Sequence, residues 1–137
     1  MIEILKSLSD TKKTAQALAL KVKNGGVICF TGDLGSGKTT MIKFICEGLG
    51  IEISKVKSPT YTYIRKYELK DRNIYHIDLY RLDSIDDIMA RELTEIWNNK
   101  KNIVLIEWAE KIDELIDVKK TRVNLSYVNE NSRKISF

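Results

Sequence analysis

The residues that constrain this chain most are those at positions 32–39, which read Gly-Asp-Leu-Gly-Ser-Gly-Lys-Thr. They fit the P-loop pattern Gly-x-x-x-x-Gly-Lys-Thr and follow an unbroken apolar run at residues 27–30, which has the length of a buried strand. Apolar side chains then recur at helical spacing over residues 41–49. This strand–turn–helix context favours a phosphate-binding turn over the alternative, a glycine turn with a purely structural role.

Each residue type in the turn has a physical task. Glycine adopts backbone angles that a Cβ would forbid, and it lets backbone amides approach phosphate oxygens closely. Amides gathered at the start of a helix attract anions. Lys38 is expected to reach the β- and γ-phosphates, and the Thr39 hydroxyl is expected to bind Mg²⁺, so the predicted cofactors are ATP and Mg²⁺. The nucleotide contacts expected within the turn are Gly32, Asp33, Gly35, Ser36, Gly37, Lys38 and Thr39.

A P-loop site also needs a carboxylate near the metal, and two acids are candidates. Glu107 follows four apolar residues at 103–106, as at the end of a buried strand, although a strand that simply leaves the core would look the same. Asp78 lies between two apolar residues, where an unpaired acid would be costly to bury, so it is expected to have a partner or a metal. In an extended strand His76, Asp78 and Tyr80 share one face. His76 is read either as a hydrogen-bonded structural residue or as a catalytic base.

Two smaller features lie near these candidates. Ser58, Pro59 and Thr60 come between the helix after the glycine turn and the next predicted strand. A hydroxyl there could bond the γ-phosphate or Mg²⁺, and a simple turn is the alternative. Trp108 directly follows Glu107, and it is interpreted either as core packing or as an aromatic side chain held at a site or partner surface.

The predicted elements alternate between strands and helices. Strands are expected at residues 2–5, 27–30, 61–68, 74–81, 103–107 and 121–127, with 61–68 and 74–81 forming a hairpin and a last turn at 129–131. Ser9 and Asp10 are expected to cap and open the first helix, and Ser84 with Asp87 the last one. This order predicts an α/β sandwich with a mixed parallel and antiparallel sheet, in one domain over residues 1–137.

Composition narrows the classes of protein further. The 23 basic and 19 acidic residues are spread along the chain and give a net charge of +4, so charge alone does not predict a nucleic-acid partner. Cys29 and Cys46 are expected to be buried free thiols, and with only His76 in addition they offer no zinc site of typical spacing. The N-terminus lacks the pattern of a signal peptide, and no apolar run is long enough to span a membrane. The cytoplasm is therefore the expected compartment.

Four segments together resemble one known family, the TsaE (YjeE) ATPases of bacterial tRNA threonylcarbamoyladenosine synthesis. The first is the extended glycine turn at 32–40, and the second is Val-Lys-Ser-Pro-Thr-Tyr-Thr at 56–62. The third is Tyr-His-Ile-Asp-Leu-Tyr-Arg-Leu at 75–82, and the fourth is Ile-Glu-Trp-Ala-Glu at 106–110. The first segment alone is generic, but all four in this order and spacing are highly specific, and the likeness covers nearly the whole chain.

The resemblance implies a P-loop NTPase fold in which antiparallel strands are added to a parallel core. It also implies that Lys38, Thr39 and Thr40 hold the phosphates and that Thr39 and Glu107 hold Mg²⁺. The catalytic residues would be Asp78, Glu107 and Lys38. Further nucleotide contacts would come from Thr60 and Trp108, and by position from Asp10, Thr11, Thr14 and Arg133 around the base or ribose.

The function that the resemblance implies is that of an accessory ATPase. Its partners would be a transferase of the TsaD type and a TsaB-type companion, with tRNA contacted only indirectly or weakly and with ATP hydrolysis, slow alone, resetting the complex. Two other functions stay open: a small-molecule kinase, for which no basic lid segment is visible, and a binding module in which ATP only orders a surface. In one departure from the family pattern, Glu92 replaces the usual glycine after the helix expected at 84–90.

Overall fold

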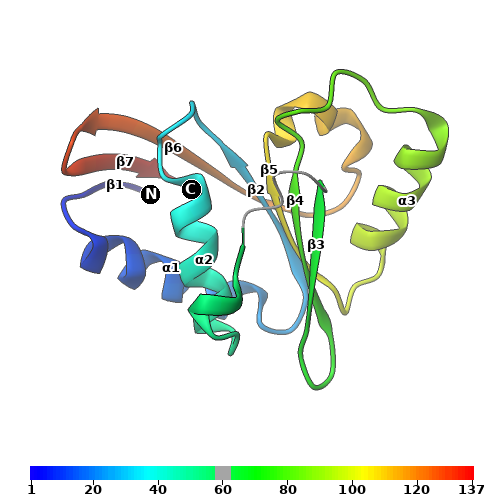
Figure 1. Cartoon of the computed structure of the whole chain (residues 1–137), viewed down its shortest axis with the longest axis horizontal. Coiled ribbons are helices and arrows are strands. Elements are labelled where there is room, and N and C mark those ends of the chain that lie inside the picture. The colour runs from blue at the N-terminus through cyan, green and yellow to red at the C-terminus, as the bar shows by residue number, and fades with distance from the viewer. Residues whose placement is uncertain (58–62) are drawn as a thin grey trace.

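The computed structural model of the chain describes residues 1–57 and 63–137, and a seven-stranded sheet forms the centre of this part (Figure 1). The strand order is β1-β7-β6-β2-β5-β4-β3. The strands are β1 Ile2–Leu5, β2 Gly26–Thr31, β3 Ile64–Glu68, β4 Asn73–Asp78, β5 Ile103–Glu107, β6 Thr121–Asn129 and β7 Ser132–Ser136. The helices are α1 Leu8–Val22, α2 Lys38–Gly48 and α3 Asp87–Asn98, with short 3₁₀ helices η1 Ile53–Lys55 and η2 Ala109–Leu115.

Parallel pairing holds the middle of the sheet together, where β6, β2, β5 and β4 are neighbours. Antiparallel pairing adds β3 at one edge, and it adds β7 and then β1 at the other. The mixed α/β sheet that the sequence predicts is therefore confirmed. The pairing of β1 with β7 brings the beginning and the end of the chain side by side (Figure 1).

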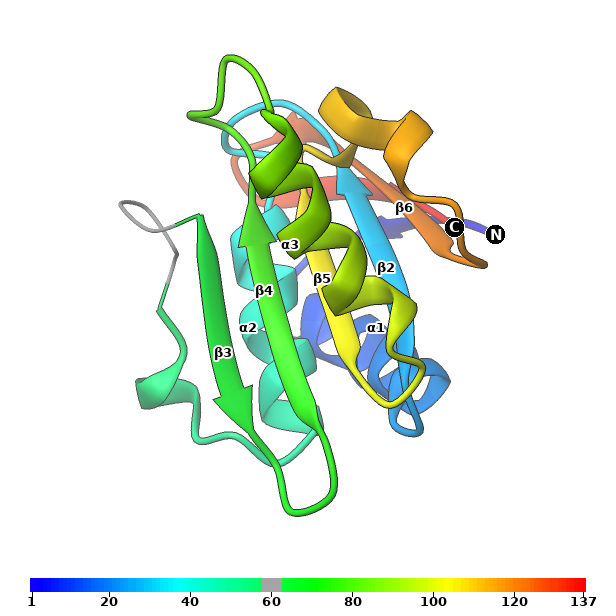
Figure 2. The same cartoon turned by 90° about the vertical axis from the view of Figure 1, so that its right-hand side faces the viewer.

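Helices cover both faces of the sheet, with α1 and α2 on one side and α3 on the other (Figure 2). The side chains of β2 alternate between the two resulting cores. Ile28 and Phe30 pack with α1 and α2, whereas Val27 and Cys29 pack with α3 and η2. Cys46 lies in the first core, so both cysteines are buried and free, as the sequence predicts. No helix within the described ranges is long and apolar enough to cross a membrane.

Helix α1 begins earlier than predicted, because Ser7 rather than Ser9 is its N-cap. The Ser7 hydroxyl accepts a hydrogen bond of 3.1 Å from the backbone N–H of Asp10. The Asp10 carboxylate in turn accepts one of 2.9 Å from the backbone N–H of Lys6. These two hydrogen bonds, to the N–H groups of Asp10 and Lys6, resemble a capping box and fix the start of the helix.

Helix α3 begins later than predicted and also runs further. Its N-cap is Asp86, whose carboxylate accepts a 2.8 Å hydrogen bond from the backbone N–H of Met89, so Ser84 is not the cap. The helix continues to Asn98 instead of ending near residue 90. Glu92 lies within this helix, where its carboxylate accepts a 3.1 Å hydrogen bond from the Tyr63 hydroxyl. The residue that departs from the family pattern therefore lies inside the helix and ties it to the segment before β3.

Strand β4 ends at Asp78, three residues before the predicted end. The Asp78 carboxylate accepts a 3.0 Å hydrogen bond from the backbone N–H of Tyr80, and the N–H of Leu82 bonds to the carbonyl of Leu79. These two bonds turn the chain away from the sheet. The prediction that His76, Asp78 and Tyr80 share one strand face is therefore wrong for Tyr80. The expected start of the preceding strand, at residues 61–62, lies outside the described residues.

Candidate nucleotide site

The glycine turn, Asp78, Glu107 and Trp108 meet at the carboxyl ends of the parallel strands, where α/β proteins commonly bind ligands. Strand β2 leads into the glycine turn and α2, and the last residues of β4 and β5, Asp78 and Glu107, are register partners. A cavity of ≈ 350 Å³ lies at this edge of the sheet. Its lining is Leu34, Gly35, Ser36, Gly37, Lys38, Thr39, Thr40, Asp78, Tyr80, Glu107, Trp108 and Arg133. Leu34 and Tyr80 are the members that sequence reasoning missed.

The glycine turn presents its backbone to this cavity. Gly35 and Gly37 have φ values of 79° and 101°, and a Cβ added at Gly35 would meet no heavy atom within 4 Å. Gly37 is the N-cap of α2 and provides no side-chain oxygen for the first N–H groups of that helix. The Ser36 hydroxyl oxygen is buried without a hydrogen-bond partner among the described residues. Free helix amides and an unsatisfied buried hydroxyl form a cradle that fits a phosphate group.

Lys38 folds back over the turn. Its side-chain ammonium donates hydrogen bonds to the carbonyl oxygens of Gly32 and, at 3.1 Å, Asp33. It also lies 4.4 Å from the centroid of the Trp108 ring. Burial lowers the pKa of Lys38, and the negative charge of Glu107 acts in the opposite direction. The cation is therefore held at the mouth of the cradle by groups that an anionic ligand can replace.

Glu107 is held from two sides. Its Oε1 accepts a 3.0 Å hydrogen bond from the Thr39 hydroxyl, and its Oε2 lies 2.7 Å from His76 Nε2. Glu107 is 2% exposed and His76 is fully buried behind it. His76 is thus the hydrogen-bonded structural residue of the two interpretations, because it contacts the carboxylate and does not line the cavity. The arrangement points one carboxylate oxygen of Glu107 at the first turn of α2.

Asp78 lies beside Glu107 with a half-buried carboxylate. Burial raises the pKa of Asp78, the backbone N–H of Tyr80 lowers it, and the charge of Glu107 raises it again. The sequence predicted a partner for this acid, and the structure shows that the partner is the backbone N–H group of Tyr80 in the turn after β4. Its other oxygen remains available to the cavity that it lines.

Trp108 combines the two roles that the sequence left open. Its backbone has a left-handed conformation with φ 60° and ψ 37°, and its N–H donates a 3.2 Å hydrogen bond to the carbonyl of Phe30. The indole ring packs 5.1 Å from the ring of Tyr80, between the second core and the cavity. The side chain is therefore partly core and partly wall of the site.

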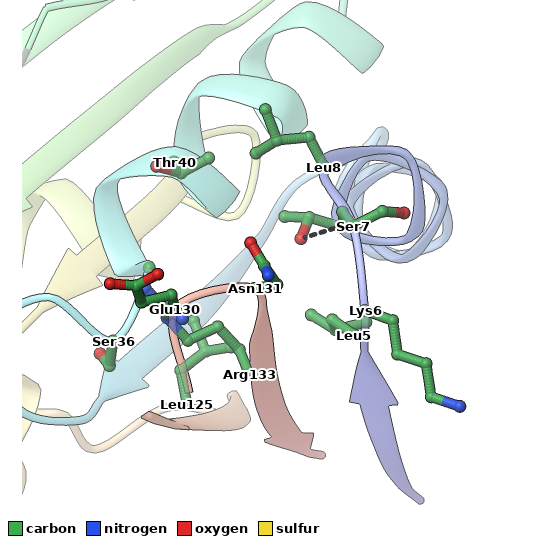
Figure 3. A pocket seen from close by; sticks show the side chains of 12 residues that line it. Leu5, Lys6, Ser7, Leu8, Ser36, Thr40, Leu125, Glu130, Asn131 and Arg133 are labelled. Atoms are coloured by element: carbon green, nitrogen blue, oxygen red, sulfur yellow. Dashed lines mark hydrogen bonds between the residues drawn. The ribbon is translucent and has the colours of Figure 1, made fainter. Parts of the chain in front are cut away.

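A second cavity, of ≈ 370 Å³, adjoins the first and shares Ser36, Gly37, Thr40 and Arg133 with it. Figure 3 shows the segment of residues 5–8, from the end of β1 and the start of α1, across the turn between β6 and β7 from Ser36 and Thr40; Leu5 and Leu8 point toward that turn and α2, and Lys6 points away. Arg133 donates hydrogen bonds to the carbonyls of Gly35 at 3.2 Å and Asn129 at 2.7 Å. The second cavity is thus built where the two ends of the chain meet.

Two of the four residues expected around the base or ribose line this second cavity, namely Thr11 and Arg133. Asp10 caps α1 instead, and Thr14 is buried and absent from the lining. The lining residues that sequence reasoning missed are Leu5, Lys6, Ser7, Leu8, Leu125, Glu130 and Asn131. The predicted turn at 129–131 was the one sequence signal for Glu130 and Asn131, and the pairing of β1 with β7 brings residues 5–8 to the same place. Thr60 lies outside the described residues.

The oxygens of Thr39 and Glu107 are the ligand type that Mg²⁺ prefers, since this ion takes one or two protein oxygens together with phosphate oxygens and water. Within residues 1–57 and 63–137 there is no cluster of three or more His, Cys, Asp or Glu side chains that could hold a metal by themselves. The donor set therefore fits a magnesium ion that arrives with a nucleotide, and it does not fit an all-protein metal cage.

Comparison with known proteins places the chain in a family. A family model described as "Threonylcarbamoyl adenosine biosynthesis protein TsaE" matches residues 5–135. A tRNA threonylcarbamoyladenosine biosynthesis protein TsaE from Rickettsia felis is 37% identical over 134 residues, which cover 98% of this chain and 77% of that protein. Its counterpart from Bacillus subtilis is 34% identical over 128 residues, covering 93% and 78%.

The fold agrees with these sequence matches. The crystal structure of Bacillus subtilis YdiB superposes with a TM-score of 0.76 at 29% identity, covering 98% of this chain and 82% of that one. The resemblance carried by the four segments at 32–40, 56–62, 75–82 and 106–110 is thereby confirmed. The chain belongs to the TsaE family.

Proposed function

We propose that this protein is an ATP-binding and ATP-hydrolysing accessory subunit of the cytoplasmic machinery that forms threonylcarbamoyladenosine in tRNA, with residues 1–137 acting as one ATPase domain. The observation that carries the proposal is the meeting of Lys38, Thr39 and Glu107 around one cavity at the head of α2. The relatives' names supply the biological process, since they are tRNA threonylcarbamoyladenosine biosynthesis proteins.

The proposed division of labour follows from the contacts. The turn amides and Lys38 bind phosphate oxygens, and Thr39 with Glu107 binds Mg²⁺, which when present neutralises charge on the phosphates. Asp78 orients the attacking water, because it lines the cavity beside Glu107 with one oxygen left over from its bond to Tyr80. Thr40 and Trp108 complete the phosphate side, and Thr11 and Arg133 lie where the base or ribose would extend.

Hydrolysis by the isolated protein is expected to be slow. In the part of the chain that the structure describes, the cations lining the phosphate cavity are Lys38 and Arg133. The Arg133 guanidinium is already bound to the carbonyls of Gly35, Asn129 and Ser132. A cation supplied by another protein accelerates P-loop hydrolysis by roughly 10³- to 10⁵-fold. We therefore propose that a TsaD-type transferase and its TsaB-type companion supply this activation.

Lys38→Ala tests the nucleotide site itself. Loss of a charge-assisted contact to two phosphates should reduce Mg·ATP affinity by at least tenfold. Isothermal titration calorimetry with the wild-type protein and Lys38→Arg as comparison gives the measurement. Unchanged binding by Lys38→Ala would overturn the nucleotide assignment. In a separate assay of the wild-type protein, transfer of phosphate to a small acceptor in place of free phosphate release would favour the kinase alternative.

Two further variants separate the roles of the carboxylates. Glu107→Gln should weaken Mg²⁺-dependent nucleotide binding, because an amide is a poorer ligand for a hard cation. Asp78→Asn should leave binding nearly intact and depress turnover, since a water-orienting group acts mainly in the transition state. Trp108 fluorescence during ATP titration with and without Mg²⁺ reports binding, and single-turnover hydrolysis with the transferase pair reports the chemistry. The reverse pattern would assign the metal ligand to the other strand.

A further inference from the structure

A groove of ≈ 800 Å³ shares no lining residue with the two cavities described above. One wall is the segment that follows β4, residues 79–85, and the other is residues 110–115 of η2. Both segments lie at the same end of the sheet (Figure 1). We call this feature the acidic groove.

The chemistry of the acidic groove is that of an amphipathic binding surface. Leu79, Leu82, Ile85, Ile112 and Leu115 give it an apolar lining. Asp83, Glu110 and Glu114 are exposed along it, and none of them forms an ion pair with another residue of the ranges 1–57 and 63–137. Among the described residues, the one cation in the lining is Lys111, whose ammonium donates hydrogen bonds to backbone carbonyls of the opposite wall. A nucleic acid would be repelled by these charges, whereas a basic protein segment with apolar side chains complements them.

The acidic groove is connected to the phosphate cavity both along the chain and through side-chain contacts. Its two walls begin immediately after Asp78 and shortly after Glu107, the two carboxylates of that site. Lys111 donates hydrogen bonds of 2.7 Å to the carbonyl of Tyr80 and 3.1 Å to that of Leu82, which join the walls. The Tyr80 ring packs 5.1 Å from Trp108, and Trp108 packs 4.4 Å from the Lys38 ammonium. A ligand that moves either wall would therefore act on Tyr80, Trp108 and Lys38, which line the phosphate cavity.

We propose that the acidic groove docks a basic, amphipathic segment of the activating transferase pair and links its binding to the nucleotide site. This inference rests on the proposed function and names the surface through which the partner acts. The occupant carries Lys or Arg side chains that pair with Asp83, Glu110 and Glu114, and apolar side chains that enter between Leu82 and Leu115. Docking there places partner cations next to a cavity whose own described cations are Lys38 and Arg133.

The test is a charge reversal in the groove with a matched reversal elsewhere. The groove variant is Asp83→Lys with Glu114→Lys, and the control is Glu3→Lys with Glu95→Lys, which makes the same charge change at exposed positions outside the groove. Thermal unfolding and Mg·ATP titration check that both proteins are folded and bind nucleotide like the wild type. Binding of the purified TsaD-type and TsaB-type proteins is then measured by biolayer interferometry at low and high salt, together with hydrolysis alone and with the pair.

We expect the groove variant to bind the pair about tenfold more weakly than the control at low salt, with a smaller difference at high salt. It should lose stimulated hydrolysis and keep basal hydrolysis. Leu115→Ser, which changes no charge, should weaken binding at both salt concentrations. If the wild type binds the pair and the groove variants bind it equally well, the inference is wrong and the proposed function stands. If the wild type neither binds the pair nor is stimulated by it, the proposed function fails and this inference with it.

Discussion

Replacing His76 by alanine should destabilise the protein chiefly through Glu107. The Glu107 carboxylate is buried, and each of its oxygens has one partner, the Thr39 hydroxyl at 3.0 Å and His76 Nε2 at 2.7 Å. Without the imidazole, Oε2 would keep no described partner. Leaving a buried acceptor without its hydrogen-bond partner costs about 1 to 3 kcal/mol, and more when the acceptor is a charged group. We expect a loss of about 3 kcal/mol in the free energy of unfolding, because Oε2 loses its partner and the ring leaves a cavity, while Thr39 still satisfies Oε1.

A double-mutant cycle with Glu107→Gln separates the carboxylate's contribution from lost packing. In the Glu107→Gln background the buried group is neutral, so His76→Ala should cost only the cavity left by the ring, about 1 to 2 kcal/mol. The expected coupling between the two positions is therefore about 1 to 2 kcal/mol. Urea unfolding followed by far-ultraviolet circular dichroism gives the free energies of the four proteins, provided that their m-values agree.

A control cycle pairs His76→Ala with Glu95→Gln, which changes an exposed acid on α3. The changes in the free energy of unfolding caused by these two substitutions should add to within about 0.5 kcal/mol. If the His76–Glu107 cycle is equally additive, the hydrogen bond between them contributes nothing to the native state. The account of how Glu107 is aimed at α2 would then be refuted. Weaker Mg²⁺-dependent ATP binding by His76→Ala at temperatures where it stays folded would support the same account from the functional side.

Two more predictions come from the glycine turn and the thiols. Gly32→Ala should destabilise the protein by about 2 to 4 kcal/mol and Gly35→Ala by about 1 to 2 kcal/mol. Both glycines have a left-handed φ, but only at Gly32 would the new Cβ lie 2.2 Å from the carbonyl oxygen of Leu125. Equal losses of stability in urea unfolding would contradict this prediction. Burial raises the pKa of Cys29 to about 11 and that of Cys46 to about 12. Both thiols should therefore stay neutral and resist iodoacetamide at pH 8 until urea unfolds the chain. Rapid alkylation of the native protein, detected by mass spectrometry, would contradict this prediction.

The phosphate turn and the strand that ends on Glu107 were predictable because their signals are local. An apolar run, a glycine pattern and a helical period lie next to one another in sequence, and the parallel order of β2 and β5 carries their ends to one edge. The helix starts were predicted less well for an equally local reason. Several capping residues stand close together before α1 and α3, and the choice of Ser7 and Asp86 depends on which N–H groups each side chain reaches.

The parts of the site that depend on distant pairing could not be predicted. Arg133 reaches Gly35 because β6, the hairpin partner of β7, pairs with β2 ahead of the glycine turn, and no local pattern reveals that pairing. The contact of His76 with Glu107 requires β4 to lie beside β5 in the observed register. A lone histidine near an acid in sequence gave only two alternatives for its role, and the register decided between them.

The backbone at Trp108 explains how two adjacent residues serve one cavity. Consecutive side chains of a strand point to opposite faces, so a straight continuation of β5 would direct Glu107 and Trp108 to different sides of the sheet. The left-handed φ of 60° at Trp108 breaks this alternation, and both side chains line the phosphate cavity. A bulky residue in this conformation costs roughly 1 to 3 kcal/mol. The hydrogen bond to Phe30 and the contacts of the indole with Tyr80 and Lys38 offset that cost. Because the same bend begins η2, the strain sits at the junction between the phosphate site and the acidic groove.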